Sequence, residues 1–141
     1  ALVFVGSEMC IRDSDLVAKF GIKICELETS KVYLFKEQSH PGRCIVAHKK
    51  HVGDMNELTA EERAAYFEDV ARVARAIMKA FNPDKVNYGA YGDTGHHLHF
   101  HLVPKYTDGY EWGGVFAMNP GEKFLSDAEY ASLIEEIRKY L

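Results

Sequence analysis

The sequence is poor in cysteine and proline and contains no long hydrophobic run. Of its 141 residues, three are cysteine and four are proline. The cysteines, at positions 10, 25 and 44, form no CxxC pair, which argues against a secreted disulfide scaffold and favours the reducing cytoplasm. No apolar run approaches the roughly 20 residues that span a bilayer, so we expect no transmembrane segment. Basic residues are in the minority: 17 Lys and Arg against 21 Asp and Glu give a net charge of −4, which disfavours nucleic acid and anionic membranes as partners.

The composition, with 47% apolar residues and 12% aromatics, predicts one folded domain. Residues 1–14, ALVFVGSEMCIRDS, lack the basic start of a signal peptide and resemble a translated sequencing adapter, so we expect them to be non-native. Without Glu8, Arg12 and Asp13, 16 basic and 19 acidic residues remain, a net charge of −3. We expect residues 15–141 to form the domain.

The hydrophobic pattern predicts an α+β fold with an antiparallel sheet. Capping boxes, Thr59 with Glu62 and Ser126 with Glu129, predict the starts of two helices. The first is long and ends at Asn82-Pro83, because proline cannot continue a helix. We therefore expect about five strands, one long central helix and a C-terminal helix. Strands are expected over residues 21–27, 31–37, 43–47, 86–92 and 96–106, and a long loop over residues 107–124.

Four of the seven histidines, His96, His97, His99 and His101, lie within six residues. Because side chains alternate along a strand, His97, His99 and His101 share one face at about 6.6 Å spacing, and the apolar residues between them share the other. Burying three such polar rings without partners would cost about 1–3 kcal/mol each. We therefore expect this row to line an open pocket, and His96 to lie on the surface.

Such a row of imidazoles suits two chemistries. Neutral imidazole binds transition metals, and His40, His48 and His51 could supply further ligands. Alternatively, imidazole acts as a nucleophile and hydrogen-bond donor around a phosphate. No histidine or cysteine follows His101, which disfavours the metal site, but the residues alone leave both chemistries open.

Three segments carry a resemblance to a known family. The run from His97 to Val103, HLHFHLV, resembles the signature of the histidine triad (HIT) superfamily. The segment 86–94 resembles the family's Asn-x-Gly…Gly-Gln-Ser/Thr loop, and 41–51 resembles its Pro-Gly-His-x-Leu-Val strand. These segments flank the long helix in the family's order, and the resemblance spans residues 31–106. It is closest to bacterial HIT-domain hydrolases and implies a HIT-like sheet and a homodimer.

The resemblance also implies a reaction. The protein would be a hydrolase or nucleotidyl transferase acting on the α-phosphate of a purine nucleotide, either a phosphoramidate or a dinucleoside polyphosphate of the AMP or GMP type. His99 would attack phosphorus to form a nucleotidyl-histidine, His101 would donate to a nonbridging oxygen, and His97 would support the row. No cofactor is required for this step in the family, and neither zinc nor magnesium is predicted. The alternatives are a nucleotide-binding adaptor or sensor with little turnover and a metal-dependent hydrolase that uses the histidine cluster.

Five further residues are implied as nucleotide-binding by the family motifs: Asn87, Asp93, Thr94, Arg43 and Glu37. Asn87 and Thr94 would contact phosphate, with a strand-end asparagine and a turn threonine as the structural alternatives. Glu37 would bind the ribose hydroxyls, with a solvent-facing glutamate as its alternative.

The sequence departs from the family pattern at two positions. Asp93 stands where the polyphosphate hydrolases usually carry glutamine, and its charge would repel a polyphosphate but not an amine leaving group. Arg43 stands where the family commonly has a fourth histidine; it would serve as a phosphate-side cation or pair with Asp93. Lys105 is interpreted as a distal phosphate contact or a solvated charge. Trp112 would stack on a base or pack at a dimer seam.

Overall fold

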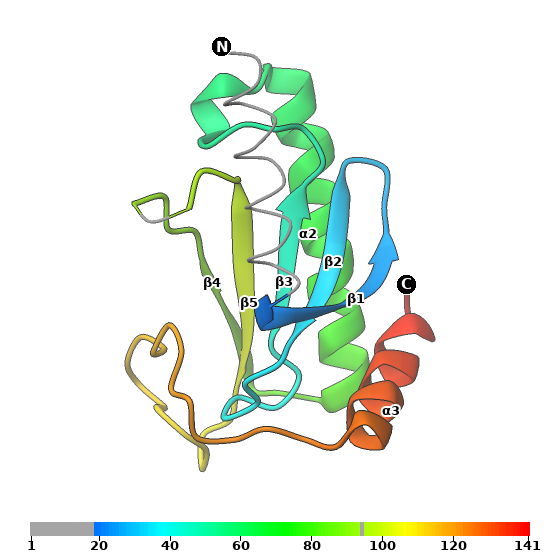
Figure 1. Cartoon of the computed structure of the whole chain (residues 1–141), viewed down its shortest axis with the longest axis vertical. Helices are drawn as coiled ribbons and strands as arrows, with labels where there is room; N and C mark the ends of the chain where they lie inside the picture. Colours follow the sequence, from blue (N-terminus) through cyan, green and yellow to red (C-terminus); the bar gives the residue numbers. More distant parts are fainter. Residues whose placement is uncertain (1–18, 94) are drawn as a thin grey trace.

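Within the residues that the computed structural model describes, 19–93 and 95–141, five strands form one antiparallel sheet (Figure 1). The adapter-like segment 1–14 and Thr94 lie outside the described residues. The strand order is β1-β2-β3-β5-β4, and every neighbouring pair is antiparallel. The strands are β1 (Gly21–Glu26), β2 (Ser30–Phe35), β3 (Cys44–His48), β4 (Lys85–Gly89) and β5 (His99–Lys105).

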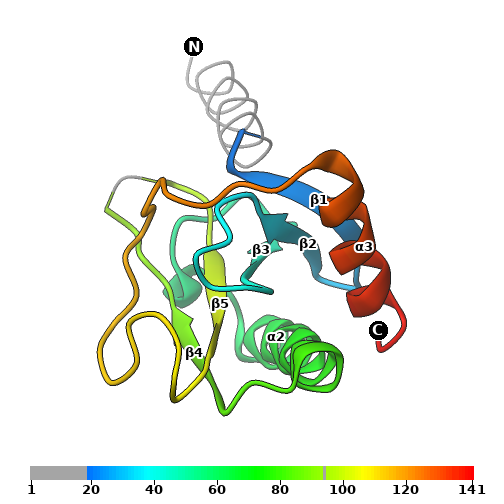
Figure 2. The same cartoon turned by 90° about the horizontal axis from the view of Figure 1, so that it is seen from below.

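Two helices pack against this sheet, and a single helical turn, η1 (Met55–Glu57), precedes the longer one. Helix α2 (Ala60–Phe81) crosses one face of the sheet, and α3 (Asp127–Arg138) packs beside α2 and β1 (Figure 2). Both predicted capping boxes are formed, so both helices begin where the sequence indicates. The predicted α+β fold, with a five-stranded antiparallel sheet, one long central helix and a C-terminal helix, is confirmed.

The main core lies between α2 and the sheet. Along α2, side chains at helical spacing are buried against apolar side chains that alternate along β2, β3 and β5. The core includes Tyr66, Val70, Val73 and Ile77 from α2, with Val32, Leu34, Val46 and Leu102 from the strands. Since residues alternate along a strand, burial of Leu102 on this face turns His101 toward the other.

The other face of the sheet is covered by the segment between β5 and α3, as predicted a long irregular stretch (Figure 2). Phe116 of this segment is buried against the ring of His101, and the main-chain carbonyl of Lys123 accepts a hydrogen bond from the Gln38 amide. The segment 115–125 therefore acts as a cover for that face, and we refer to it as the covering segment.

A buried carboxylate fixes the turn between β1 and β2 to α2. Asp69 accepts hydrogen bonds from the Thr29 amide at 2.9 Å, the Thr29 hydroxyl at 2.6 Å and the Ser30 hydroxyl at 2.8 Å. Replacing Asp69 by alanine leaves these buried donors without their acceptor, so we expect the free energy of unfolding to fall by about 1–3 kcal/mol. Urea unfolding measures this change. The exposed neighbour Glu68, replaced in the same way, is the control; equal midpoints for the two variants would contradict the prediction.

Candidate functional site

The structure brings the three histidines of the row together at the start of β5. Strand β5 begins at His99, so His97 lies in the preceding loop, whereas His99 and His101 project from the same face. The ring centroids of His99 and His101 are 5.2 Å apart. His96 is exposed, as expected.

His99 has one ring nitrogen bound and one ring nitrogen available. Its Nδ1 lies 2.7 Å from the main-chain carbonyl oxygen of His97. Because a carbonyl oxygen can only accept, Nδ1 must carry the proton and donate it. The neutral ring then bears its lone pair on Nε2, and the ring lines a cavity. This is the state that a nucleophilic imidazole requires.

His97 ties the same loop to β3. Its Nε2 donates to the main-chain carbonyl of His48, so the ring is oriented by the backbone. The exposed ring of His51 packs edge to face against the His97 ring, with 5.9 Å between the two ring centroids. His48 itself is buried beneath Tyr66, and its Nδ1 accepts from the Lys50 amide at 2.9 Å. Burial lowers the pKa of His48 from its ordinary value.

His101 does not line an open pocket, which corrects the expectation for the row. Its side chain is covered, with 4% of the residue exposed, by the rings of Phe35, Tyr91 and Phe116. The physical reason is the covering segment, which places Phe116 over this end of the row. Burial, followed by the charges of Arg43 and His99, lowers the pKa of His101 to about 3. The ring is therefore neutral at physiological pH.

A cavity of about 170 Å³ lies at the open end of the row. Its volume is below the roughly 300–1,000 Å³ of typical ligand pockets, so it accommodates a phosphoryl group and its nearest substituents rather than a whole nucleotide. Asp93 is exposed and follows directly in the sequence on Gly92, which lines this cavity. The lining residues come from two loops and the row itself: Gly53, Asp54, Met55, Ala90, Tyr91, Gly92, His97, Leu98 and His99.

Asn87 lies on β4, outside this cavity. It lines a second, shallow cavity of about 330 Å³ together with Tyr88, Val115 and Phe116. Tyr91 lines both cavities and so stands between Asn87 and His99. Sequence reasoning did not single out Tyr91. The period-2 pattern from Asn87 onward could have found it, because positions 87, 89 and 91 continue the face that carries His101.

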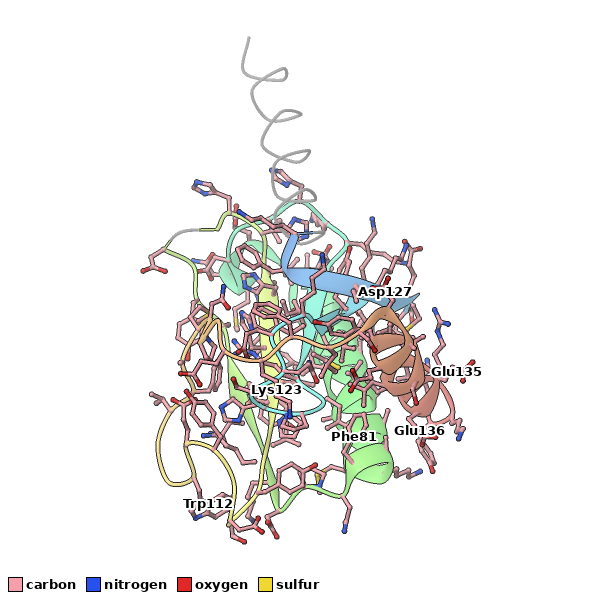
Figure 3. The ribbon with its side chains drawn as sticks, turned by 60° about the horizontal axis from the view of Figure 1, so that its bottom comes forward. Phe81, Trp112, Lys123, Asp127, Glu135 and Glu136 are labelled. Atoms are coloured by element: carbon pink, nitrogen blue, oxygen red, sulfur yellow. The ribbon has the colours of Figure 1, made fainter. Side chains whose placement is uncertain are left out.

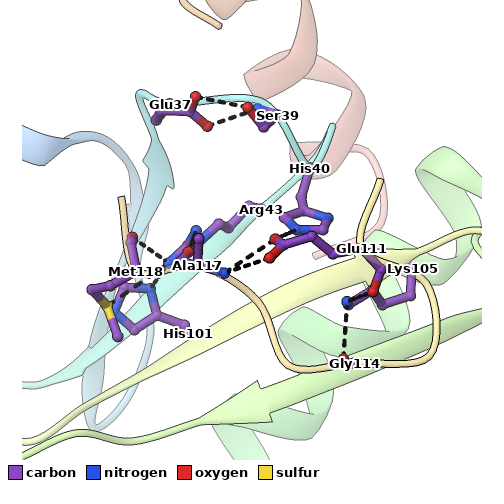
Figure 4. A network of polar contacts seen from close by, with 10 residues as sticks. All are labelled: Glu37, Ser39, His40, Arg43, His101, Lys105, Glu111, Gly114, Ala117 and Met118. Carbon is purple, nitrogen blue, oxygen red and sulfur yellow. Dashed lines mark hydrogen bonds and ion pairs between the residues drawn. The ribbon is translucent and has the colours of Figure 1, made fainter. Parts of the chain in front are cut away.

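Arg43 lies behind His101 rather than beside a phosphate, which corrects both of its expected roles (Figure 4). The residue has no exposed surface, and its guanidinium sits 4.1 Å from the ring centroid of Phe35 and 4.9 Å from that of Phe116. Among the described residues, Arg43 forms no ion pair with the exposed Asp93. The arginine is buried because main-chain carbonyls of the covering segment accept its hydrogen bonds.

Glu37 is also buried, so neither the ribose contact nor the solvent-facing alternative holds. Its carboxylate accepts from the amide and hydroxyl of Ser39, each at 2.8 Å, and from the amides of Glu122 and Lys123 at 2.8 and 2.9 Å. Burial alone would raise the pKa of Glu37, but these hydrogen bonds outweigh it and lower that pKa. The residue anchors the covering segment to the turn after β2.

Lys105 and Trp112 lie at the far end of β5 from the cavity. The Lys105 ammonium is buried and donates to the carbonyls of Glu111 at 2.6 Å and Gly114 at 3.2 Å, so it is neither a phosphate contact nor a solvated charge. Trp112 is exposed on the loop that follows β5 (Figure 3), and β5 has His99 at its other end, so the structure does not place Trp112 beside the cavity. Its place at a dimer seam stays a prediction.

The described residues do not assemble the ligand set that a metal site would need. His40 is buried and its Nε2 contacts the Glu111 carboxylate at 2.8 Å rather than a second histidine, while burial lowers its pKa. Across residues 19–93 and 95–141, no three or more histidine, cysteine, aspartate or glutamate side chains converge on one point as metal ligands. His40, His48 and His51 therefore serve separate local contacts.

Residues 21–108 match the family model described as the HIT domain. A curated relative, "Protein hit" from Bacillus subtilis, is 31% identical over 99 residues, which cover 67% of this chain and 68% of the relative. Adenosine 5'-monophosphoramidase hnt1 from Schizosaccharomyces pombe is 28% identical over 123 residues, covering 82% of this chain and 85% of that protein.

Solved structures agree in fold. A histidine triad protein from Sinorhizobium meliloti superposes with a TM-score of 0.84 at 22% identity, covering 90% of this chain and 94% of that one. A histidine triad protein from Marinobacter aquaeolei gives a TM-score of 0.83 at 20% identity, covering 90% and 93%. Among the described helices, none has both the length and the hydropathy needed to cross a bilayer.

Proposed function

This chain belongs to the HIT domain family, and on that premise we propose that it is a nucleotide hydrolase in which His99 attacks the α-phosphorus. One observation carries the proposal: the hydrogen bond from His99 Nδ1 to the His97 carbonyl leaves the lone pair on Nε2 of a ring that lines the cavity. The cavity has room for a phosphoryl group, and an unprotonated imidazole nitrogen on its wall can act as the nucleophile toward the α-phosphorus.

The proposed reaction has two displacements at phosphorus. First, Nε2 of His99 forms a bond to the α-phosphorus while the bond from phosphorus to the leaving nitrogen breaks; this nitrogen keeps the electron pair and takes a proton from solvent, so it departs as a neutral amine. The positive charge that develops on the imidazole is stabilised by the Nδ1–H bond to the His97 carbonyl at 2.7 Å. Water then forms the new P–O bond and releases a proton to solvent, the bond from phosphorus to His99 Nε2 breaks with its electron pair returning to the ring, and a nucleoside monophosphate leaves.

The charges around the cavity favour an amine leaving group over a polyphosphate. Asp54 lines the cavity and Asp93 is exposed next to it. Two carboxylates repel a polyanionic leaving group, whereas an amine carries no negative charge as it departs. We therefore propose a purine nucleoside phosphoramidate as the substrate. The relative from fission yeast named as an adenosine 5'-monophosphoramidase supports this choice.

We further propose a homodimer in the cytoplasm. Strand β4 forms an edge of the sheet, and the exposed side chains of Tyr88 and Val115 lie beside it, which supports a covered interface. The free thiols of Cys25 and Cys44 are in keeping with a reducing compartment. Light scattering after size exclusion tests the dimer.

A substrate panel with and without chelator tests the proposed reaction. We expect AMP release from adenosine phosphoramidate to exceed release from diadenosine tetraphosphate, and to be unchanged by EDTA, because the imidazole rather than a metal-activated water attacks phosphorus. Product is measured by liquid chromatography. Activity restored only by zinc or manganese would contradict the mechanism, and tight nucleotide binding without product would identify an adaptor instead.

A further inference from the structure

We propose that Arg43 is a positioning residue that holds His101 as the neutral tautomer with its proton on Nε2. The catalytic part of this inference rests on the proposed function, while the tautomer itself does not. Nη2 of Arg43 lies 3.0 Å from Nδ1 of His101, and both groups are buried.

The direction of this hydrogen bond follows from the chemistry of guanidinium. Arginine has donors and no acceptor, so His101 Nδ1 must present a lone pair to it. The two hydrogens of Nη2 are both used, one toward His101 and the other toward the Met118 carbonyl at 2.9 Å. A neutral imidazole with a bare Nδ1 carries its proton on Nε2.

The guanidinium cannot readily turn away from His101. Its Nη1 donates to the Ala117 carbonyl at 3.0 Å, and the faces of the Phe35 and Phe116 rings bracket the group. Glu37 and Glu111 supply the nearby negative charge that keeps the buried cation favourable. Burial lowers the pKa of Arg43 to about 10, so it still bears a charge at neutral pH.

A fixed cation beside Nδ1 has two effects on His101. It prevents the opposite tautomer, whose Nδ1–H would meet the arginine's own N–H. It also opposes protonation of the ring, adding to the effect of burial. His101 therefore offers a neutral Nε2–H donor on the same strand face as the His99 ring, whose centroid lies 5.2 Å away. Because the His101 ring is covered here, this donor reaches the phosphate oxygens of a nucleotide once the exposed side chain of Tyr91, which lines the cavity beside it, moves aside. The other tautomer would aim a lone pair at those oxygens.

Nitrogen NMR of the ligand-free full-length chain tests the tautomer without any substrate. Long-range proton–nitrogen spectra distinguish a bare from a protonated ring nitrogen, and a His101→Asn sample assigns the signals. We expect a bare Nδ1 and a protonated Nε2, unchanged from about pH 5 to pH 8. A protonated Nδ1, or a ring that titrates in this range, would overturn the proposal.

Two variants test the role of the guanidinium. In Arg43→Met, which keeps an unbranched apolar side chain but removes the donors and the charge, we expect a mixture of tautomers and a His101 ring that titrates at higher pH. We also expect a fall in kcat of about 10- to 100-fold with a smaller change in KM. Arg43→Lys, which restores one charged donor, should recover the Nε2 tautomer and part of kcat. Arg75→Met, on the exposed side of α2, is the matched control.

The outcomes separate this inference from the proposed function. Hydrolysis together with the Nδ1-protonated tautomer, or an Arg43→Met protein with unchanged His101 signals, overturns the role of Arg43 alone. The expected tautomer in a protein that hydrolyses no nucleotide overturns the proposed function and with it the catalytic role. If Arg43→Met does not fold, the wild-type tautomer and the Arg43→Lys protein decide the matter.

Discussion

Replacement of His99 by alanine is expected to abolish nucleotide hydrolysis, with a loss in kcat of at least about 10⁴-fold. The variant lacks the nitrogen that attacks phosphorus, and no other described ring at the cavity has the same arrangement: His97 uses its Nε2 on a backbone carbonyl, and His101 is covered. Release of AMP, followed by liquid chromatography under single-turnover conditions, measures the change.

The control for this variant is His96→Ala. His96 is exposed and belongs to the same cluster, but it contributes nothing to the cavity lining, so hydrolysis should be unchanged. Mass analysis of acid- or alkali-quenched enzyme adds a direct readout: a nucleotidyl adduct should appear on the peptide containing His99 and be missing from His99→Ala. Comparable rates for the two alanine variants would refute the proposed nucleophile.

Acidification from about pH 7 to pH 5 is expected to lower the free energy of unfolding by about 2 kcal/mol through His101 alone. The folded ring has a pKa of about 3, whereas the unfolded chain binds the proton near the ordinary value of about 6.5. Its contribution to stability is therefore complete above pH 6.5 and is lost as the pH falls toward 3. Burial also lowers the pKa values of His40 and His48, so both add to the loss in the same direction.

Urea unfolding at the two pH values measures this loss. His101→Gln should show a clearly smaller difference between pH 7 and pH 5, whereas His96→Gln, at an exposed site, should show the wild-type difference. Carboxylates with lowered pKa, among them Glu37 and Glu111, add the same pH dependence to wild type and to His101→Gln, so the comparison between the two proteins cancels it. An equal pH dependence in His101→Gln and wild type would contradict the burial of the ring.

Local sequence signals predicted the fold because each depends on a few adjacent residues. The capping pairs at Thr59 and Ser126 place helix starts, and Asn82, in the left-handed conformation at φ 48°, ends α2 before Pro83. The alternation along β5 likewise predicted that His99 and His101 share a face. These patterns repeat with the period of the backbone, which the sequence displays directly.

The surroundings of the site were less predictable, because they depend on contacts between distant segments. Glu37, Arg43 and Lys105 are charged, and residue type alone favours the surface for each. All three are buried because main-chain groups from residues 111–123 form hydrogen bonds with them. Because that segment is irregular, it has no periodic pattern from which the hydrogen bonds between its main chain and these side chains could be predicted.

The covering segment accepts hydrogen bonds of 3.0 and 2.9 Å from Arg43 through the backbone oxygens of Ala117 and Met118, while the side chains of Phe116 and Met118 contact the guanidinium at longer range. Most side chains at these two positions would present the same two oxygens, so these hydrogen bonds depend little on which residues stand there. Adding or deleting one residue before them would instead shift the register of both oxygens and release the guanidinium. For these two hydrogen bonds, the length of the covering segment is therefore constrained more strongly than the identity of its residues.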